Sequence, residues 1–113
     1  MKWVGLLLLA AACSAKDEGA GDDAEFVNVT VAPNQFQPAS LTIKVGQTVR
    51  WTWRGGTHNV VSGPDCDQAD GVFKSGAPIG GGTFEHHFEV AGTFPYHCES
   101  HCQDGMKGEI VVE

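Results

Sequence analysis

Short runs in which apolar and polar residues alternate follow one another from residue 26 to the end of the chain. Alternation with a period of two places successive side chains on opposite faces of a β-strand, and segments that bear glycine or proline separate the runs. The expected strands are residues 26–31, 41–45, 48–53, 58–61, 83–90, 93–97 and 109–112. No helical periodicity appears after residue 25. The pattern therefore predicts an all-β domain built as a two-sheet Greek-key β-sandwich.

The same alternation assigns faces to several aromatic side chains. Trp51 and Trp53 are two residues apart, so they share one face of their strand, and we expect both in the core. His86 and His87 are neighbours that point to opposite faces, so they cannot form a joint site. We expect one of these histidines to be packed and the other to be solvated.

The N-terminal residues follow a different pattern. Residues 3–12 form an uncharged run that is too short to cross a bilayer as a helix but has the length of the apolar region of an export signal. We therefore predict a signal peptide over residues 1–12, with a buried helix as the alternative. Residues 9–13 (LAAAC) also resemble a bacterial lipobox, which implies that Cys13 is the lipidated first residue of the mature chain. Ordinary cleavage, which would release a soluble exported protein, is the competing interpretation.

Residues 14–25 (SAKDEGAGDDAE) contain five acidic residues and no large apolar side chain, which is typical of a solvated tether. The expected organisation is therefore a signal peptide (1–12), a lipidated cysteine with a flexible acidic tether (13–25), and one domain (26–113). With 113 residues, 42% of them hydrophobic, the chain can supply the core of one small domain but not of two.

The balance of charge limits the partners. Seven Lys and Arg residues stand against 14 Asp and Glu residues, for a net charge of -7. This balance disfavours a protein that binds nucleic acid or an anionic membrane through a basic surface.

Residues able to bind a metal gather near the C-terminus. Cys98, His101 and Met106 lie between two expected strands, so one loop can bring all three to a point. Two imidazoles, a thiolate and a weak axial thioether make the site that suits copper as it cycles between Cu(I) and Cu(II). His58, close after the turn at residues 55–56, is the expected second imidazole, because the loops of a sandwich gather at its ends.

Several further segments occur in a characteristic order along the chain: FQP (36–38), LTI (41–43), VGQTV (45–49), WTW (51–53), GGTHNVV (55–61), DGVFKSG (70–76) and GTFPYHC (92–98). In these segments, from residue 26 to residue 113, the chain resembles the cupredoxins, the type 1 blue copper proteins, of the plastocyanin and halocyanin type. The resemblance implies that His58, Cys98, His101 and Met106 are the ligands of one copper ion. It also implies that Asn59 ties the first ligand loop to the cysteine loop, as a residue that orients the ligands.

Two further cysteines remain once Cys13 is assigned to lipid and Cys98 to copper. An exported protein meets an oxidising environment, so we expect Cys66 and Cys102 to form a disulfide, with two free thiols as the alternative. Because Cys98 and Cys102 are four residues apart, a binuclear copper centre is a second interpretation, although it would need histidine where Met106 stands. His97 should point away from the metal, because it precedes Cys98 in the same strand.

A copper ion held without an open ligand position favours outer-sphere electron transfer over catalysis. We therefore expect an exported, membrane-tethered electron carrier, not an enzyme, on the periplasmic or cell-surface face of a bacterial membrane. The expected partners are redox proteins, such as a c-type cytochrome or a membrane electron-transfer complex. We expect the carrier to bind no nucleic acid and no small-molecule substrate, and to be a monomer. A copper-delivery module and an adhesion domain that has kept only the fold are the alternatives.

Overall fold

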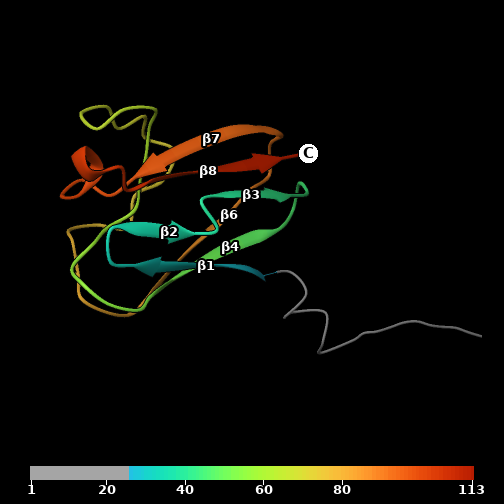
Figure 1. Ribbon diagram of the computed structural model, residues 1–113. Coiled ribbons are helices and arrows are strands. Elements are labelled where there is room, and N and C mark those ends of the chain that lie inside the picture. Colours follow the sequence, from blue (N-terminus) through green and yellow to red (C-terminus); the bar gives the residue numbers. More distant parts are fainter. Residues whose placement is uncertain (1–25) are drawn as a thin grey trace, which may run out of the picture.

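The computed structural model describes residues 26–113, which form two four-stranded sheets and one short 3₁₀ helix (Figure 1). The elements are β1 (Phe26–Ala32), β2 (Gln35–Gln37), β3 (Ser40–Ile43), β4 (Thr48–Trp53), β5 (Val61–Ser62), β6 (Thr83–His87), β7 (Gly92–His97), the 3₁₀ helix η2 (Cys102–Asp104) and β8 (Lys107–Val112). The strand orders are β2-β1-β4-β6 and β3-β8-β7-β5. The predicted all-β sandwich is confirmed, and each sheet is mixed, because β1 pairs with β4 and β3 with β8 in parallel.

The core between the sheets is built from the alternating positions of the strands. In β4, Val49, Trp51 and Trp53 are buried, which confirms the prediction that both tryptophans belong to the core. The Trp51 ring lies 5.4 Å from the rings of Phe73 and Tyr96, centroid to centroid. Large aromatic rings that meet in this way bury much apolar area, which a small sandwich needs for its core.

The two neighbouring histidines of β6 behave as their alternation predicts. His86 is half-buried and lies against Phe73 and Phe88, with ring centroids 5.0 and 4.7 Å away. His87 is exposed and is bonded to the Thr48 hydroxyl at 3.0 Å. One histidine therefore packs on the core edge while the other belongs to the surface.

The observed strands differ from the expected ranges, most clearly at β2, β5 and β6. Strand β2 was not expected, because only Phe36 of its three residues faces the core, which is too short a run to show alternation. Of the strand expected at residues 58–61, only Val61 lies in a strand, the two-residue β5. His58 instead forms an isolated bridge with Ile79. The strand expected at residues 83–90 ends at His87, although Phe88 still exchanges backbone hydrogen bonds of 2.7 and 3.0 Å with Gly46 and Gln47, just before β4.

The sheet pairings place the two ends of the domain. Phe26 pairs with Thr48 at the start of β4, and Gly92 at the start of β7 pairs with Val112 at the end of β8. The strands β4 and β7 both run toward the other end of the sandwich, where the loops that carry His58 and Cys98 lie (Figure 1). The first and last described residues are therefore at the pole opposite these loops.

The expected signal peptide, the lipidated Cys13 and the acidic tether all lie outside the described residues. Within residues 26–113, there is no helix with the length and apolar character needed to cross a membrane.

Candidate metal centre

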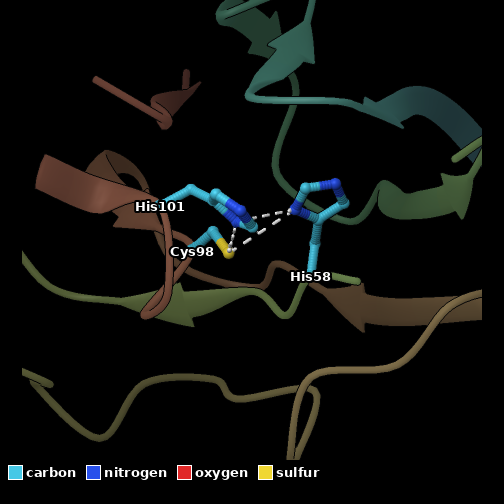
Figure 2. A group of neighbouring side chains, drawn as sticks. All are labelled: His58, Cys98 and His101. Carbon is cyan, nitrogen blue, oxygen red and sulfur yellow. Dashed lines mark hydrogen bonds between the residues drawn. The ribbon is translucent and has the colours of Figure 1, made fainter. Parts of the chain in front are cut away.

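Three predicted ligands meet at the end of the sandwich where β7 stops. The Nδ1 atoms of His58 and His101 are 3.1 Å apart, and Cys98 Sγ lies 3.8 Å from the first and 3.6 Å from the second (Figure 2). These residues form the one group of three or more histidine, cysteine or acidic residues in residues 26–113 whose ligand atoms converge within 4.8 Å. His58 and Cys98 are buried, whereas His101 is partly exposed.

His58 is held from three sides. Its backbone exchanges two hydrogen bonds of 2.9 Å with Ile79, and its carbonyl accepts a bond of 2.8 Å from the Trp53 indole. Its ring lies against Gly56, where a Cβ atom would come within 2.4 Å of His58 Nε2 and where φ is +76°. Both the space and the backbone conformation at residue 56 therefore require glycine.

The loop from Cys98 to Met106 closes on itself through its backbone. The Cys98 N–H donates to the Met106 carbonyl at 3.1 Å, and the Met106 N–H donates to the His101 carbonyl at 3.2 Å. Between them, helix η2 ends at Gly105, whose φ of +89° is the left-handed conformation that lets the chain turn back. The loop thus brings Cys98, His101 and Met106 close together, and its backbone hydrogen bonds restrain their separation.

Met106 is fully buried and belongs to the same core cluster as Cys98. A lone buried methionine in a small sandwich is ordinarily part of the core. Here it ends the same closed loop that carries Cys98 and His101, so it would supply the weak thioether donor to a copper ion held by those residues.

Asn59 joins the two ligand loops, as the resemblance implied. Its side-chain oxygen accepts a hydrogen bond of 2.9 Å from the Glu99 N–H, and its side-chain nitrogen donates to the Glu99 carboxylate at 2.7 Å. The same nitrogen donates to the Gly76 carbonyl at 2.9 Å. Residues adjacent to His58 and to Cys98 are therefore locked together.

The Cys98 sulfur is prepared for ionisation. Burial opposes the charged form, but hydrogen bonds from the Ser100 hydroxyl, the Asn59 backbone and the two histidines outweigh it and lower the pKa of Cys98 to about 6. A thiolate is the form of cysteine that binds metals. The thiol can therefore offer a metal its ligand form at neutral pH.

The donor set fits a copper ion. Donors placed around one first-row metal, about 2.0 Å away for nitrogen and about 2.3 Å for sulfur, stand roughly 3.1–3.8 Å from one another. The three sides of the triangle formed by His58, Cys98 and His101 lie in this range. Two facing Nδ1 atoms cannot both carry protons at 3.1 Å, so at least one lone pair points into the triangle.

The predicted disulfide is present. Cys66 and Cys102 are joined, with their Cα atoms 5.4 Å apart, and Cys98 is the one free cysteine among residues 26–113. This pairing excludes the alternative of two free thiols. It also removes the binuclear interpretation, because the Cys102 sulfur is already bonded. The bond ties the residue after His101 to the loop that follows β5.

Comparison with known proteins agrees with this geometry. The family described as copper binding proteins, plastocyanin/azurin family, matches residues 23–113. The chain belongs to this family. Its metal centre is therefore the mononuclear copper site of a cupredoxin, built from a thiolate, two imidazoles and a methionine.

This cupredoxin is similar to a halocyanin and to plastocyanins. Halocyanin of Natronomonas pharaonis is 41% identical over 97 residues, which cover 79% of this chain and 56% of halocyanin. The chain thus spans little more than half of that relative. Plastocyanin of Scenedesmus fuscus is 38% identical over 86 residues, which cover 69% of this chain and 86% of the plastocyanin. Among solved structures, a purple cupredoxin from Nitrosopumilus maritimus gives a TM-score of 0.67 at 27% identity, covering 77% of this chain and 99% of that one.

Three features of the site escaped the sequence analysis. These are the contact of Gly56 with the His58 ring, the Trp53 hydrogen bond to the His58 carbonyl, and the approach of Ser100 to Cys98 Sγ at 3.4 Å. The paired glycines at residues 55–56 were a visible signal of the first. The other two depend on how distant segments meet. His97 is buried and lies outside the ligand group, in agreement with its predicted orientation.

Proposed function

We propose that this cupredoxin is an exported electron carrier that passes single electrons between redox proteins while a lipid holds it at a bacterial membrane. The observation that carries the proposal is a closed, buried donor set from which one ligand, His101, reaches the surface. When bound, copper supplies the ability to take up and release one electron. The other requirements of electron transfer fall on the residues of this chain.

The residues around the donor set limit its movement and provide a path for the electron to the surface. The backbone bonds of the 98–106 loop, the Asn59 bridge and the disulfide restrain the donors, so that they change little between oxidation states. The partly exposed ring of His101, whose Nδ1 lies 3.6 Å from Cys98 Sγ, offers a route from the buried sulfur to a partner at this end of the sandwich. No ligand position is left for a substrate, which supports a carrier and not an enzyme.

Copper delivery is the second candidate function. A delivery protein must release its ion readily, whereas His58, Cys98 and Met106 are each no more than 1% exposed. Stopped-flow mixing of the reduced protein with an oxidised c-type cytochrome, beside incubation with a copper chelator, separates the two functions. We expect electron transfer in milliseconds to seconds and copper loss over hours. Copper loss as fast as electron transfer would instead establish delivery.

The axial position gives a test of the redox role. Replacing Met106 by glutamine should leave copper bound, because the two imidazoles and the thiolate hold most of the affinity, but it should lower the reduction potential. An oxygen donor is harder than a thioether and favours Cu(II). Voltammetry of the two loaded proteins measures the change. An unchanged or raised reduction potential in Met106→Gln would show that Met106 is not the axial ligand.

Lipidation of Cys13 would complete the carrier. Phe26 begins β1 at the pole opposite the ligand loops, so a lipid on Cys13 would be attached through the end of the domain that lies away from the copper site. A flexible linker of twelve residues would span about 20 Å, which is enough to let a small domain turn toward its partners. Intact-mass analysis of the mature protein should find acyl chains on Cys13. A mature chain without acyl mass, or one in the soluble fraction, would defeat this part of the proposal.

A further inference from the structure

Ser100 lies beside the expected copper ligands, in the loop that runs from Cys98 to Met106. Its Oγ atom lies 3.4 Å from Cys98 Sγ and 3.2 Å from His101 Nδ1. The residue before it, Glu99, is fixed to Asn59 through a backbone hydrogen bond of 2.9 Å. The Ser100 hydroxyl is therefore held next to two atoms of the donor set by a restrained backbone.

The chemistry of the neighbours sets the direction of this hydrogen bond. Once the Nδ1 atoms of His58 and His101 bind the metal, neither has a free lone pair or a proton for the hydroxyl. The thiolate of Cys98 still has lone pairs and no proton, so it can only accept. Of the two nearby atoms, Cys98 Sγ is then the one to which Ser100 can donate.

We propose that Ser100 tunes the copper centre by donating a hydrogen bond from its hydroxyl to Cys98 Sγ, which raises the reduction potential. The inference rests on the proposed electron-carrier function and adds to it a residue that sets the driving force. Ser100 is not proposed as a copper ligand; it acts on copper only through the Cys98 sulfur.

The direction of the change in reduction potential follows from the negative charge that the sulfur carries in each oxidation state. In the oxidised state the thiolate shares its electrons with Cu(II), and in the reduced state more of the negative charge stays on the sulfur. A hydrogen bond to an ionised acceptor grows stronger as the acceptor gains charge. The Ser100 bond therefore stabilises the reduced state more than the oxidised state, as expected for hydrogen bonds around a copper-bound cysteine.

Three variants of the full chain test the proposal. Ser100→Ala removes the donor, and Ser100→Thr keeps a hydroxyl. Ser40→Ala removes an exposed serine outside the ligand loops, whose hydroxyl donates to the Glu109 carboxylate. In Ser100→Ala we expect the redox equilibrium to shift about three- to tenfold toward the oxidised form, which is ~30–60 mV for one electron. The thiolate-to-copper absorption band should move to lower energy. Ser100→Thr and Ser40→Ala should match the wild type.

Copper affinities give a second readout that a merely structural role would not produce. Chelator competition with Cu(I) and with Cu(II) should show that Ser100→Ala weakens Cu(I) binding relative to Cu(II) by the same factor as the shift in the redox equilibrium. Equal losses of both affinities, an unchanged potential, or a threonine variant that behaves like alanine would each overturn the tuning role while leaving the carrier intact. A wild type without a thiolate-to-copper band would overturn the proposed function and this inference together.

Discussion

Replacement of Cys98 by serine is expected to abolish the intense visible absorption of the copper-loaded protein and to weaken copper binding by more than ~100-fold. The absorption arises because a thiolate donates charge to Cu(II), and a serine hydroxyl cannot do so at neutral pH. Cys98 is fully buried and is the one free cysteine among residues 26–113, so no other described sulfur of this kind can take its place.

The matched control is His87→Gln, which removes an exposed imidazole outside the ligand group. Absorption spectra and copper titrations of both variants should show loss of the band in Cys98→Ser alone. Far-ultraviolet circular dichroism checks that each variant retains its strands. If folded Cys98→Ser kept the band, or if His87→Gln lost it, the assignment of the thiolate ligand would be wrong.

Removal of the disulfide is expected to cost ~3–4 kcal/mol of unfolding free energy in the metal-free protein. Cys66 and Cys102 are 36 residues apart in sequence, so the bond restricts a long loop of the unfolded chain. Urea unfolding of the Cys66→Ser, Cys102→Ser double variant measures the loss. The double variant avoids leaving one unpaired thiol near the copper site.

The same variant should also release copper faster, because Cys102 directly follows His101 and the bond fixes this residue to the loop after β5. That loop is itself anchored, with the Gly63 N–H donating to the Pro95 carbonyl at 2.8 Å and the Asp70 N–H to the Ser62 carbonyl at 2.9 Å. A loss of less than ~1 kcal/mol with unchanged copper release would show that the ligand loop does not depend on the disulfide.

Most of the site could be predicted from the sequence because most of it is local. Cys98, His101 and Met106 belong to one loop, so their spacing alone brings a thiolate, an imidazole and a thioether together. His58 comes from a distant segment, and its assignment needed the expectation that loops gather at the ends of a sandwich, supported by the family resemblance. The disulfide followed from counting cysteines once two of them had been given other roles.

What the sequence did not reveal depends on tertiary contacts. Strand β2 has one buried side chain, Phe36, whose ring meets Tyr96 edge-on with centroids 4.6 Å apart. Its strand conformation follows from pairing with β1, not from its own pattern. His58 lies outside β5 because its backbone pairs with Ile79, a partner 21 positions later that no alternation marks. Ser100 looks like an ordinary loop residue until its hydroxyl is seen beside Cys98 Sγ.

The most direct test of the central claim is a spectroelectrochemical titration of the purified, copper-loaded protein. We expect one copper per chain and an intense thiolate-to-copper band that bleaches on reduction and returns on oxidation. The titration should follow a one-electron curve, with about 59 mV for each tenfold change in the ratio of the two forms. Absence of the band, or bleaching that is not reversed because copper has left the protein, would contradict an electron carrier built on His58, Cys98, His101 and Met106.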